Sequence, residues 1–329
     1  MRLILSLTAL LLLAVACGGG QASTPSPGVS QSPTPKPATA PPTLAPTASP
    51  TPVPTPAPTP APTPVATPGP AVDLSLSRAR QGGFLAVRLL NPPPALTAAR
   101  VMFRETPYPM LPEGDHWYAL IGLDTQMAPG DYSVEVDAPD RALAVASASI
   151  GDGGFQFESL TLPPSSTDLV SDTTAVDQER ATLNQIYSGL TPLRKWSGPW
   201  IMPAVGIISN PFGLQRSING GPYYPHTGTD IANDKGTPVV AAAPGTVVLA
   251  RPMYLYGNAV VIDHGAGVFS SYNHLDSIVA TEGQQIAEGQ LLGLMGETGF
   301  VNGPHVHWEA IISGVRTDAT LWTQADIEP

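Results

Sequence analysis

The chain has 329 residues, a single cysteine and a formal net charge of −11, and its prolines crowd the N-terminal part. The acidic balance argues against nucleic acid as a partner and against a general phosphate-binding role, because such proteins present basic surfaces. The single cysteine excludes an intramolecular disulfide bond. Beyond the N-terminal segment, no apolar run is long enough to predict a membrane-spanning helix.

Residues 1–17 predict a secretory signal peptide. Arg2 is followed by an apolar run of 13 residues from Leu3 to Val15, which is too short for a stable membrane span but suits a signal. The sequence LAVAC, ending at Cys17, resembles the lipobox of bacterial lipoproteins. This resemblance implies cleavage before Cys17, a lipid on that cysteine, and an exported protein anchored at the membrane and facing the cell wall. The alternative is an ordinary signal peptide.

Residues 18–71 predict a disordered tether. From Gln21 onward the segment is almost wholly Pro, Thr, Ala and Ser, so it cannot bury enough apolar surface to offset the cost of ordering its backbone. At about 3.1 Å per residue in polyproline II, some fifty residues reach on the order of 150 Å. The tether would let an anchored domain search the space outside the membrane. A partner that reads PxxP sequences is the less favoured alternative.

Residues 72–160 predict an immunoglobulin-like β-sandwich, because short apolar runs alternate with turn residues. Tyr132, Val134 and Val136 show the two-residue period of a half-buried strand. The expected strands read GGFLAVRLL, ARVMFRE, HWYALIGL, GDYSVEVDA and ALAVASASI. The similarity is one of architecture alone, since no pair of cysteines is present. We expect His116 to be a structural or surface residue.

Residues 161–199 predict a helical connector. Apolar residues recur at i, i+3, i+4 and i+7 and define one helical face: Leu183, Ile186, Tyr187 and Leu190. Gly189 and Pro192 mark the end of the helix. We expect this helix to connect two β domains, and covering part of a cleft is the alternative.

Residues 200–329 predict a second, mainly β domain, because Gly and Pro interrupt nearly every apolar run. The charged residues concentrate after the tether, where 13 basic and 26 acidic residues give residues 72–329 a net charge near −13. The fold class is therefore mainly β throughout, with one connecting helix.

Five of the six histidines lie between residues 226 and 307, and four of these fall in the words HTGTD, YNHL and HVH. In an extended backbone His226 and Asp230 would point the same way, with Gly228 between them leaving space for an ion. His305 and His307 would share one side of a strand. Two imidazoles and a carboxylate, with an open fourth position for water, are typical of catalytic zinc.

If one histidine of HVH binds a metal ion, the other lies on the same side of the strand and therefore close to that ion. Either His305 or His307 suits the metal, and the other would be placed to take a proton from the water as general base. The alternative is a set of histidines that hydrogen bond within a polar β surface. Four histidines and an aspartate in three words favour a metal site.

The words HTGTDIA, YNHL and GPHVHWE resemble the HxxxD, HxxH-like and HxH motifs of the LytM or lysostaphin-type zinc endopeptidases, peptidase family M23. The resemblance covers residues 201 to about 320, including ISNPFGLQR before the first motif and KGTPVVAAAPGTVV after it. It implies a LytM-type antiparallel β-sheet in residues 200–329 and one zinc ion per chain. It also implies hydrolysis of peptide bonds in the stems or cross-bridges of peptidoglycan, and thus cell-wall remodelling.

Carried over by position, the resemblance implies that His226, Asp230 and His307 bind zinc. It implies that His305 and His274 are the catalytic pair, in which His305 activates the water. His274 then orients that water or stabilises the oxyanion.

Other residues near these motifs have weaker claims. His264 is left out of the site, because a strand-end histidine followed by glycine is more often a turn or packing residue. Asn210 and Arg216 are candidates to line the substrate groove. Tyr223 or Tyr224 is a candidate oxyanion donor, without a firm choice between them.

Two rival functions remain to be weighed. EGQQIAEGQLLGLMGETG resembles the hairpin of lipoyl or biotinyl carriers, but no lysine follows Lys235, so the carrier function is excluded. The second rival is a non-catalytic wall-binding lipoprotein or an activator of another wall hydrolase, as the family resemblance allows. The complete set of metal ligands favours an enzyme over this rival. A second protein that activates the enzyme is a candidate partner.

Overall fold

The described part of the chain consists of β-strands, one α-helix and a short 3-10 helix. The computed structural model describes residues 68–161, 172–327 and 329, so the predicted signal, Cys17 and nearly all of the predicted tether lie outside the described residues. Residues Pro64–Pro329 group as one compact unit. Within the described ranges, no helix has the length and apolarity needed to cross a membrane. The mainly β prediction is confirmed.

The segment predicted as a sandwich forms two four-stranded antiparallel sheets. One has the order β1 (Ala71–Asp73), β2 (Phe84–Leu90), β6 (His116–Gly122), β5 (Leu111–Glu113). The other has the order β4 (Thr106–Pro109), β3 (Arg100–Phe103), β7 (Gly130–Ala138), β8 (Arg141–Ile150). The five predicted strands correspond to β2, β3, β6, β7 and β8, whereas β1, β4 and β5 were not predicted.

Side-chain alternation explains how these two sheets share a core. In β7, Val134 and Val136 are fully buried while Ser133 and Glu135 are exposed. Residues of both sheets enter one cluster, including Leu85 from β2. Each fully buried aliphatic side chain contributes about 1.5–3 kcal/mol.

Helix α2 (Thr173–Tyr187) confirms the predicted helix, with one difference. Asp172 caps it by accepting a hydrogen bond from Ala175 N at 3.1 Å. Leu183 and Tyr187 are buried, as their spacing predicts, whereas Leu190 lies beyond the helix end and is exposed. The helix ends at Tyr187 because the chain turns through Ser188 and Gly189.

A large antiparallel sheet occupies the segment predicted as the second β domain. Its main path is β10 (Ile207–Asn210), β13 (Thr229–Ala232), β20 (His305–Ile312), β17 (Val268–Ile278), β16 (Gly257–Gly265), β15 (Gly245–Met253), β18 (Gln285–Ile286). Strands β14 (Pro238–Val240), β19 (Leu291–Met295) and β21 (Val315–Thr317) pair alongside it. The 3-10 helix η2 (Ala319–Thr323) follows β21.

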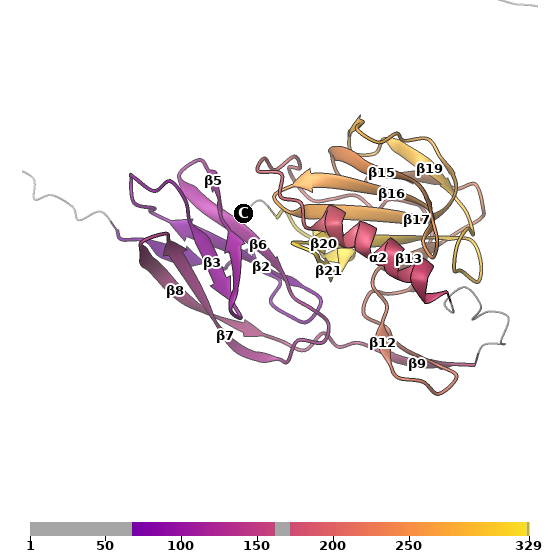
Figure 1. The fold of residues 1–329 in the computed structure, drawn as a ribbon, viewed down its shortest axis with the longest axis horizontal. Coiled ribbons are helices and arrows are strands. Elements are labelled where there is room, and N and C mark those ends of the chain that lie inside the picture. The colour runs from indigo at the N-terminus through magenta and orange to yellow at the C-terminus, as the bar shows by residue number, and fades with distance from the viewer. Residues whose placement is uncertain (1–67, 162–171, 328) are drawn as a thin grey trace, which may run out of the picture. The chain divides into compact units, whose positions relative to one another are not determined.

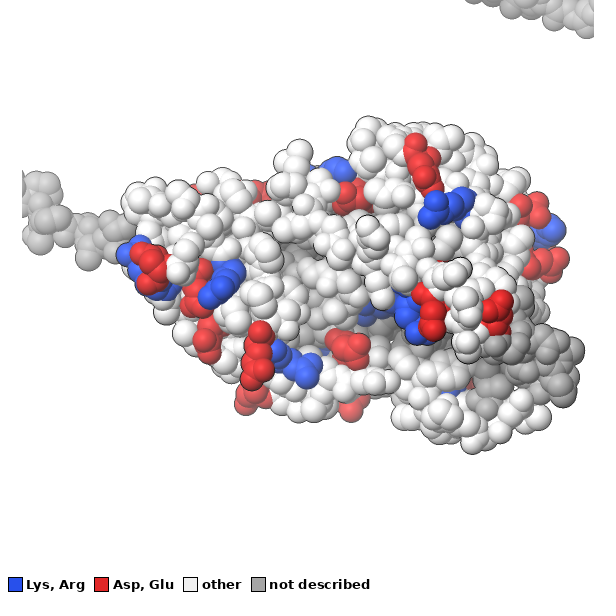
Figure 2. Space-filling view, viewed as in Figure 1, with Lys and Arg blue, Asp and Glu red and all other residues white. Residues whose placement is uncertain are grey.

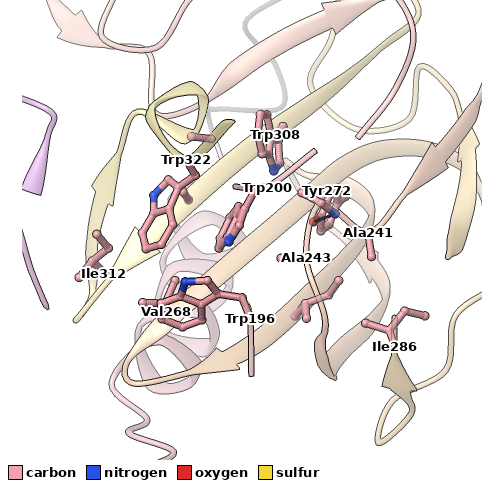
Figure 3. Packing of buried hydrophobic residues seen from close by; sticks show 14 of the residues in the cluster. Trp196, Trp200, Ala241, Ala243, Val268, Tyr272, Ile286, Trp308, Ile312 and Trp322 are labelled. Atoms are coloured by element: carbon pink, nitrogen blue, oxygen red, sulfur yellow. Dashed lines mark hydrogen bonds between the residues drawn. The ribbon is translucent and has the colours of Figure 1, made fainter. Parts of the chain in front are cut away.

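One face of the large sheet is covered by tryptophans. Trp308 of β20 belongs to this face, and the rings of Trp200 and Trp322 stack at a centroid distance of 4.6 Å. Figure 3 shows Trp196 gathered with these two rings. Phe84 of β2 stacks on Trp322 at 5.3 Å, so the core of this face continues into the sheet that contains β2.

The other face carries helix α2, which lies across the strands in Figure 1. Leu183 and Tyr187 pack there against Leu249, Phe269 and Ile311. Ile311, Glu309, His307 and His305 alternate along β20 with the residues of the tryptophan face. This face is therefore dry under the helix and polar farther along β20.

A small third sheet has the order β12 (Tyr224–Pro225), β11 (Gln215–Ile218), β9 (Phe157–Leu160). β9 pairs in parallel with β11, and Glu158 forms an ion pair with Arg216 at 3.3 Å. The pairing was not predicted, because it joins segments far apart in sequence. It fixes the hairpin that leads directly into His226.

The surface matches the composition. On the face shown in Figure 2, acidic and basic side chains are interspersed, and several lie side by side. A basic surface of the kind that binds nucleic acid is not seen on that face.

Candidate metal centre

Two neighbouring strands bring the predicted ligands together. Asp230 of β13 lies opposite His307 of β20, so their side chains share one face of the sheet. His226 precedes β13, and the chain bends at Gly228, between His226 and Asp230. The expectation of a continuous extended backbone from His226 to Asp230 is therefore wrong. The bend brings the two side chains together.

Three donor atoms converge on one point. His226 Nε2 lies 3.2 Å from Asp230 Oδ1 and 3.1 Å from His307 Nδ1. His307 Nδ1 lies 2.8 Å from the same oxygen of Asp230. These three residues are the one group among the described residues whose ligand atoms lie within 4.8 Å of one another. All three are nearly or fully buried, with at most 9% of each residue exposed.

Hydrogen bonds on the far side of each ring set which nitrogen carries the proton. His226 Nδ1 donates to Pro211 O at 3.0 Å, which leaves the lone pair on Nε2. His307 Nε2 donates to Glu309 Oε1 at 3.2 Å, which leaves the lone pair on Nδ1. The nitrogens that face Asp230 Oδ1 can therefore give up their protons and offer lone pairs when a metal ion binds, while the protons on the far side stay hydrogen bonded.

The surroundings of Asp230 complete the fit to a metal ion. Asn210 Nδ2 donates to Asp230 Oδ2 at 2.8 Å, so the carboxylate is held by one oxygen and offers the other. A Cβ on Gly228 would meet His307 Nε2 at 2.7 Å, so only glycine leaves room for the ring. Two imidazole nitrogens and one carboxylate oxygen are a donor set that suits zinc.

His305 also faces this point. Its Nδ1 donates to Gly303 O at 2.9 Å, and its Nε2 lies 3.6 Å from Asp230 Oδ1. It precedes His307 by two residues, the spacing of one strand face, as the sequence predicts. A neutral imidazole with its free nitrogen here can accept a proton from a water near the three ligand atoms.

His274 reaches the same site through an irregular backbone. The preceding residue, Asn273, pairs with His307 and shares its face, so a regular strand would turn His274 to the opposite face. Instead His274 has φ of 65°. Tyr256 O accepts its backbone N–H, and Thr298 O accepts its Nδ1–H, both at 2.9 Å. This left-handed conformation brings its ring to 4.9 Å from that of His305.

Neighbouring charges and burial set the proton affinities in the metal-free site. Burial disfavours the charge of Asp230, but hydrogen bonds with His226 and His307 hold its pKa well below the usual range. Burial alone would lower the pKa of His307, yet Asp230 and Glu309 outweigh it and raise that pKa to about 9. Burial, together with His307 and His305, lowers the pKa of His274 to about 3.

A pocket of about 340 Å³ adjoins His305. It is lined by Ser209, Asn210, Ala232, Asn302, Gly303, Pro304 and His305. Asn210 therefore lies beside a cavity, whereas Arg216 lies in the small third sheet and pairs with Glu158. Tyr223 accepts or donates a hydrogen bond with Ser159 Oγ at 3.1 Å, and both Tyr223 and Tyr224 are exposed.

The remaining two histidines lie elsewhere. His264 is fully buried on the tryptophan face, between Pro244 O and Ser270 Oγ, each 2.7 Å away. His116 Nε2 lies 3.0 Å from Pro329 O. Neither is near the three ligand atoms.

The sequence interpretation missed the residues behind His307. Glu309 Oε1 accepts hydrogen bonds from Arg316 Nε at 3.0 Å and from Tyr256 Oη at 3.1 Å. Two signals were present: Glu309 continues the His305, His307 alternation, and the Ser-Gly pair before β21 predicts a two-residue hairpin that returns Arg316 to the same face. No local signal points to Tyr256.

This geometry agrees with comparisons to known proteins. Residues 224–319 match the model of peptidase family M23. The peptidoglycan DD-endopeptidase ShyA of Vibrio cholerae is 47% identical over 95 residues, which are 29% of this chain and 22% of that protein. The DD-carboxypeptidase/endopeptidase Mpg of Neisseria meningitidis is 41% identical over 107 residues, 32% of this chain and 25% of that protein. The chain thus spans about a quarter of these relatives.

A crystal structure of a peptidase M23 from Pseudomonas aeruginosa has a TM-score of 0.59 and 26% sequence identity. The aligned region includes 76% of the present chain and 96% of the Pseudomonas aeruginosa chain. The similarity in fold therefore extends beyond the residues that match the family.

Proposed function

We propose that this protein is a zinc endopeptidase that cuts peptide bonds of peptidoglycan. The observation that carries the proposal is the convergence of His226 Nε2, Asp230 Oδ1 and His307 Nδ1, with His305 Nε2 only 3.6 Å from that oxygen. The activities named for ShyA and Mpg support a DD-peptide bond as the target.

The three ligands and the nearby histidines divide the chemistry. Zinc held by His226, Asp230 and His307 would act as a Lewis acid that polarises the scissile carbonyl and makes a water more acidic. His305 accepts the proton of that water at Nε2, because its Nδ1 proton stays hydrogen bonded to Gly303 O. The same Nε2 then delivers a proton to the departing amine.

We assign His274 the role of orienting the water. Its Nδ1 proton is donated to Thr298 O, so the neutral ring offers an acceptor at Nε2. Burial keeps the ring neutral near pH 7, since its pKa is lowered to about 3. An acceptor orients a water but does not stabilise an oxyanion, so the first of the two predicted roles is favoured. We place one side chain of the cleaved peptide in the pocket beside His305.

The test is mass spectrometry of fragments released from purified sacculi by residues 64–329, which group as one compact unit. The wild type is expected to create new amine and carboxyl ends that name the bond. His305→Ala is expected to keep zinc and lose turnover by about 10²–10⁴-fold. Asp230→Ala is expected to lose zinc and turnover together. Loss of zinc from His305→Ala contradicts the scheme, and a zinc-loaded wild type that releases nothing favours a regulator or a partner-activated enzyme.

We also propose that Cys17 carries a lipid and that residues 18–71 tether the enzyme outside the membrane, on the strength of the lipobox and the proline-rich composition. Metabolic labelling with an alkyne fatty acid tests this proposal. Label is expected on the wild type and not on Cys17→Ser, and an unlabelled membrane-bound wild type contradicts it.

We infer further that residues 72–160 are immunoglobulin-like. The strand orders β1-β2-β6-β5 and β4-β3-β7-β8 support this inference, because they correspond to ABED and C′CFG in that fold. The domain boundaries at residues 72, 161 and 200 remain predictions.

A further inference from the structure

His307 differs from the other histidines of the site in what accepts its proton. His226, His274 and His305 donate to the backbone carbonyls of Pro211, Thr298 and Gly303. His307 donates to a carboxylate, that of Glu309. A carboxylate acceptor makes the imidazole more basic at its other nitrogen and holds the ring more firmly.

Glu309 belongs to a cluster that extends away from the metal centre. We define the buried carboxylate cluster as Tyr256, His307, Glu309 and Arg316. Glu309 has no exposed surface, and its Oε1 receives donors from the other three members at 3.0–3.2 Å. Arg316 also donates to Tyr256 Oη at 3.2 Å, so two of the three donors to Glu309 are linked to each other.

Helix α2 covers this cluster, although the helix lies outside the residues that match the family. The Arg316 guanidinium carbon lies 5.7 Å from the centroid of the Tyr187 ring. Glu179 accepts the backbone N–H of Leu255 at 3.0 Å, next to Tyr256. Both contacts place the helix against the cluster. Glu309 is fully buried there, and hydrogen bonds between charged groups are stronger away from water.

We propose that Glu309 is a positioning residue, which fixes the His307 ring so that Nδ1 faces the metal, and that Arg316 and Tyr256 hold Glu309 in place. The inference rests on the metal centre of the proposed function but not on its peptidase activity. Glu309 does not touch the substrate or the metal, and it acts through His307.

The test measures zinc affinity by competition with a chromophoric chelator, using residues 64–329. Glu309→Gln keeps the size of the side chain and removes its charge, and is expected to weaken zinc binding about 10–100-fold. Glu288→Gln makes the same change on an exposed glutamate and is expected to bind zinc like the wild type. Equal affinity of Glu309→Gln and Glu288→Gln overturns the inference.

A second variant separates positioning from a purely structural role. Glu309→Gln leaves the partly buried Arg316 without its carboxylate, which itself destabilises the fold. The double variant Glu309→Gln/Arg316→Gln removes both charges, and is expected to recover the melting temperature of the metal-free protein while zinc affinity stays low. Recovery of zinc affinity as well would show that Glu309 only balances Arg316, and overturns the inference.

The outcomes also separate this inference from the proposed function. A wild type that binds no zinc removes the metal centre, and this inference with it. A wild type that binds zinc but leaves sacculi intact contradicts the peptidase activity, while the affinities of the variants still decide the role of Glu309.

Discussion

The large sheet buries His264 on one face and His307 on the other, and the two have opposite chemistry. His264, on the tryptophan face, has a carbonyl and a hydroxyl as partners, and burial lowers its pKa to about 4. His307, on the α2 face, meets two carboxylates, which overcome burial and raise its pKa to about 9. Both rings are almost completely enclosed, so burial alone does not distinguish them. The neighbours decide whether a buried histidine is a packing residue or a ligand.

Replacing each of these two histidines by glutamine gives the largest expected difference between the two faces. His307→Gln is expected to abolish zinc binding and sacculus cleavage, because one of three ligands is lost. His264→Gln is expected to retain both, since His264 lies on the opposite face. Zinc content after dialysis and fragment release measure the two effects. Loss of zinc from His264→Gln would show that the two faces are not independent.

A smaller effect is expected from adding one carbon beside the His307 ring. In Gly228→Ala the new Cβ would meet His307 Nε2 at 2.7 Å and Trp308 O at 2.6 Å, so the ring must move. Zinc affinity is expected to fall roughly tenfold or more, as for other displaced ligand partners. Gly151→Ala is the control, because its Cβ would meet nothing closer than 3.7 Å. Equal zinc affinity of the two variants contradicts the tight fit.

The two pKa shifts predict opposite dependences of stability on pH in the metal-free protein. The raised pKa of His307 stabilises the fold fully below its ordinary value of 6.5, and this contribution is lost as pH rises through about 9. The lowered pKa of His264 gives a contribution present above 6.5 that is lost as pH falls towards about 4.

Denaturant unfolding in a metal chelator at pH 5, 7 and 9 tests these windows. His264→Gln is expected to reduce the loss of stability between pH 7 and 5. His307→Gln is expected to reduce the loss between pH 7 and 9. The assignment is wrong if the two variants exchange these effects or if neither changes the pH profile.

The sequence predicted the parts of the fold and site that depend on local periodicity. The strand runs and helix α2 follow from periods of two and 3.6 residues. The spacing of HTGTD and HVH pointed to His226, Asp230 and one of His305 and His307, and the family resemblance chose His307, which the structure places with the other two. His274 was carried only by the family resemblance. Its side chain reaches the site through a left-handed backbone, and a regular strand period points it the wrong way.

What the sequence did not predict depends on contacts between distant segments. The parallel pairing of β9 with β11 joins residues more than fifty positions apart, and no local pattern encodes it. Tyr256 enters the buried carboxylate cluster from a turn that Glu179 of helix α2 holds. Such contacts are decided by packing, so a periodic pattern finds the ligands but not all of the residues that hold them.

The last prediction concerns the cover of the α2 face. Tyr187 packs against Phe269 at a ring distance of 5.7 Å and lies under Arg316, so Tyr187→Leu removes both contacts. Unfolding is expected to become easier by about 2–3 kcal/mol, within the range for truncated core side chains. Leu193→Ala, at an exposed position beyond the same helix, is expected to stay within about 0.5 kcal/mol of the wild type. Equal stability of the two variants would mean that the helix is not a closely packed cover, and water would then reach Glu309 and weaken its hold on His307.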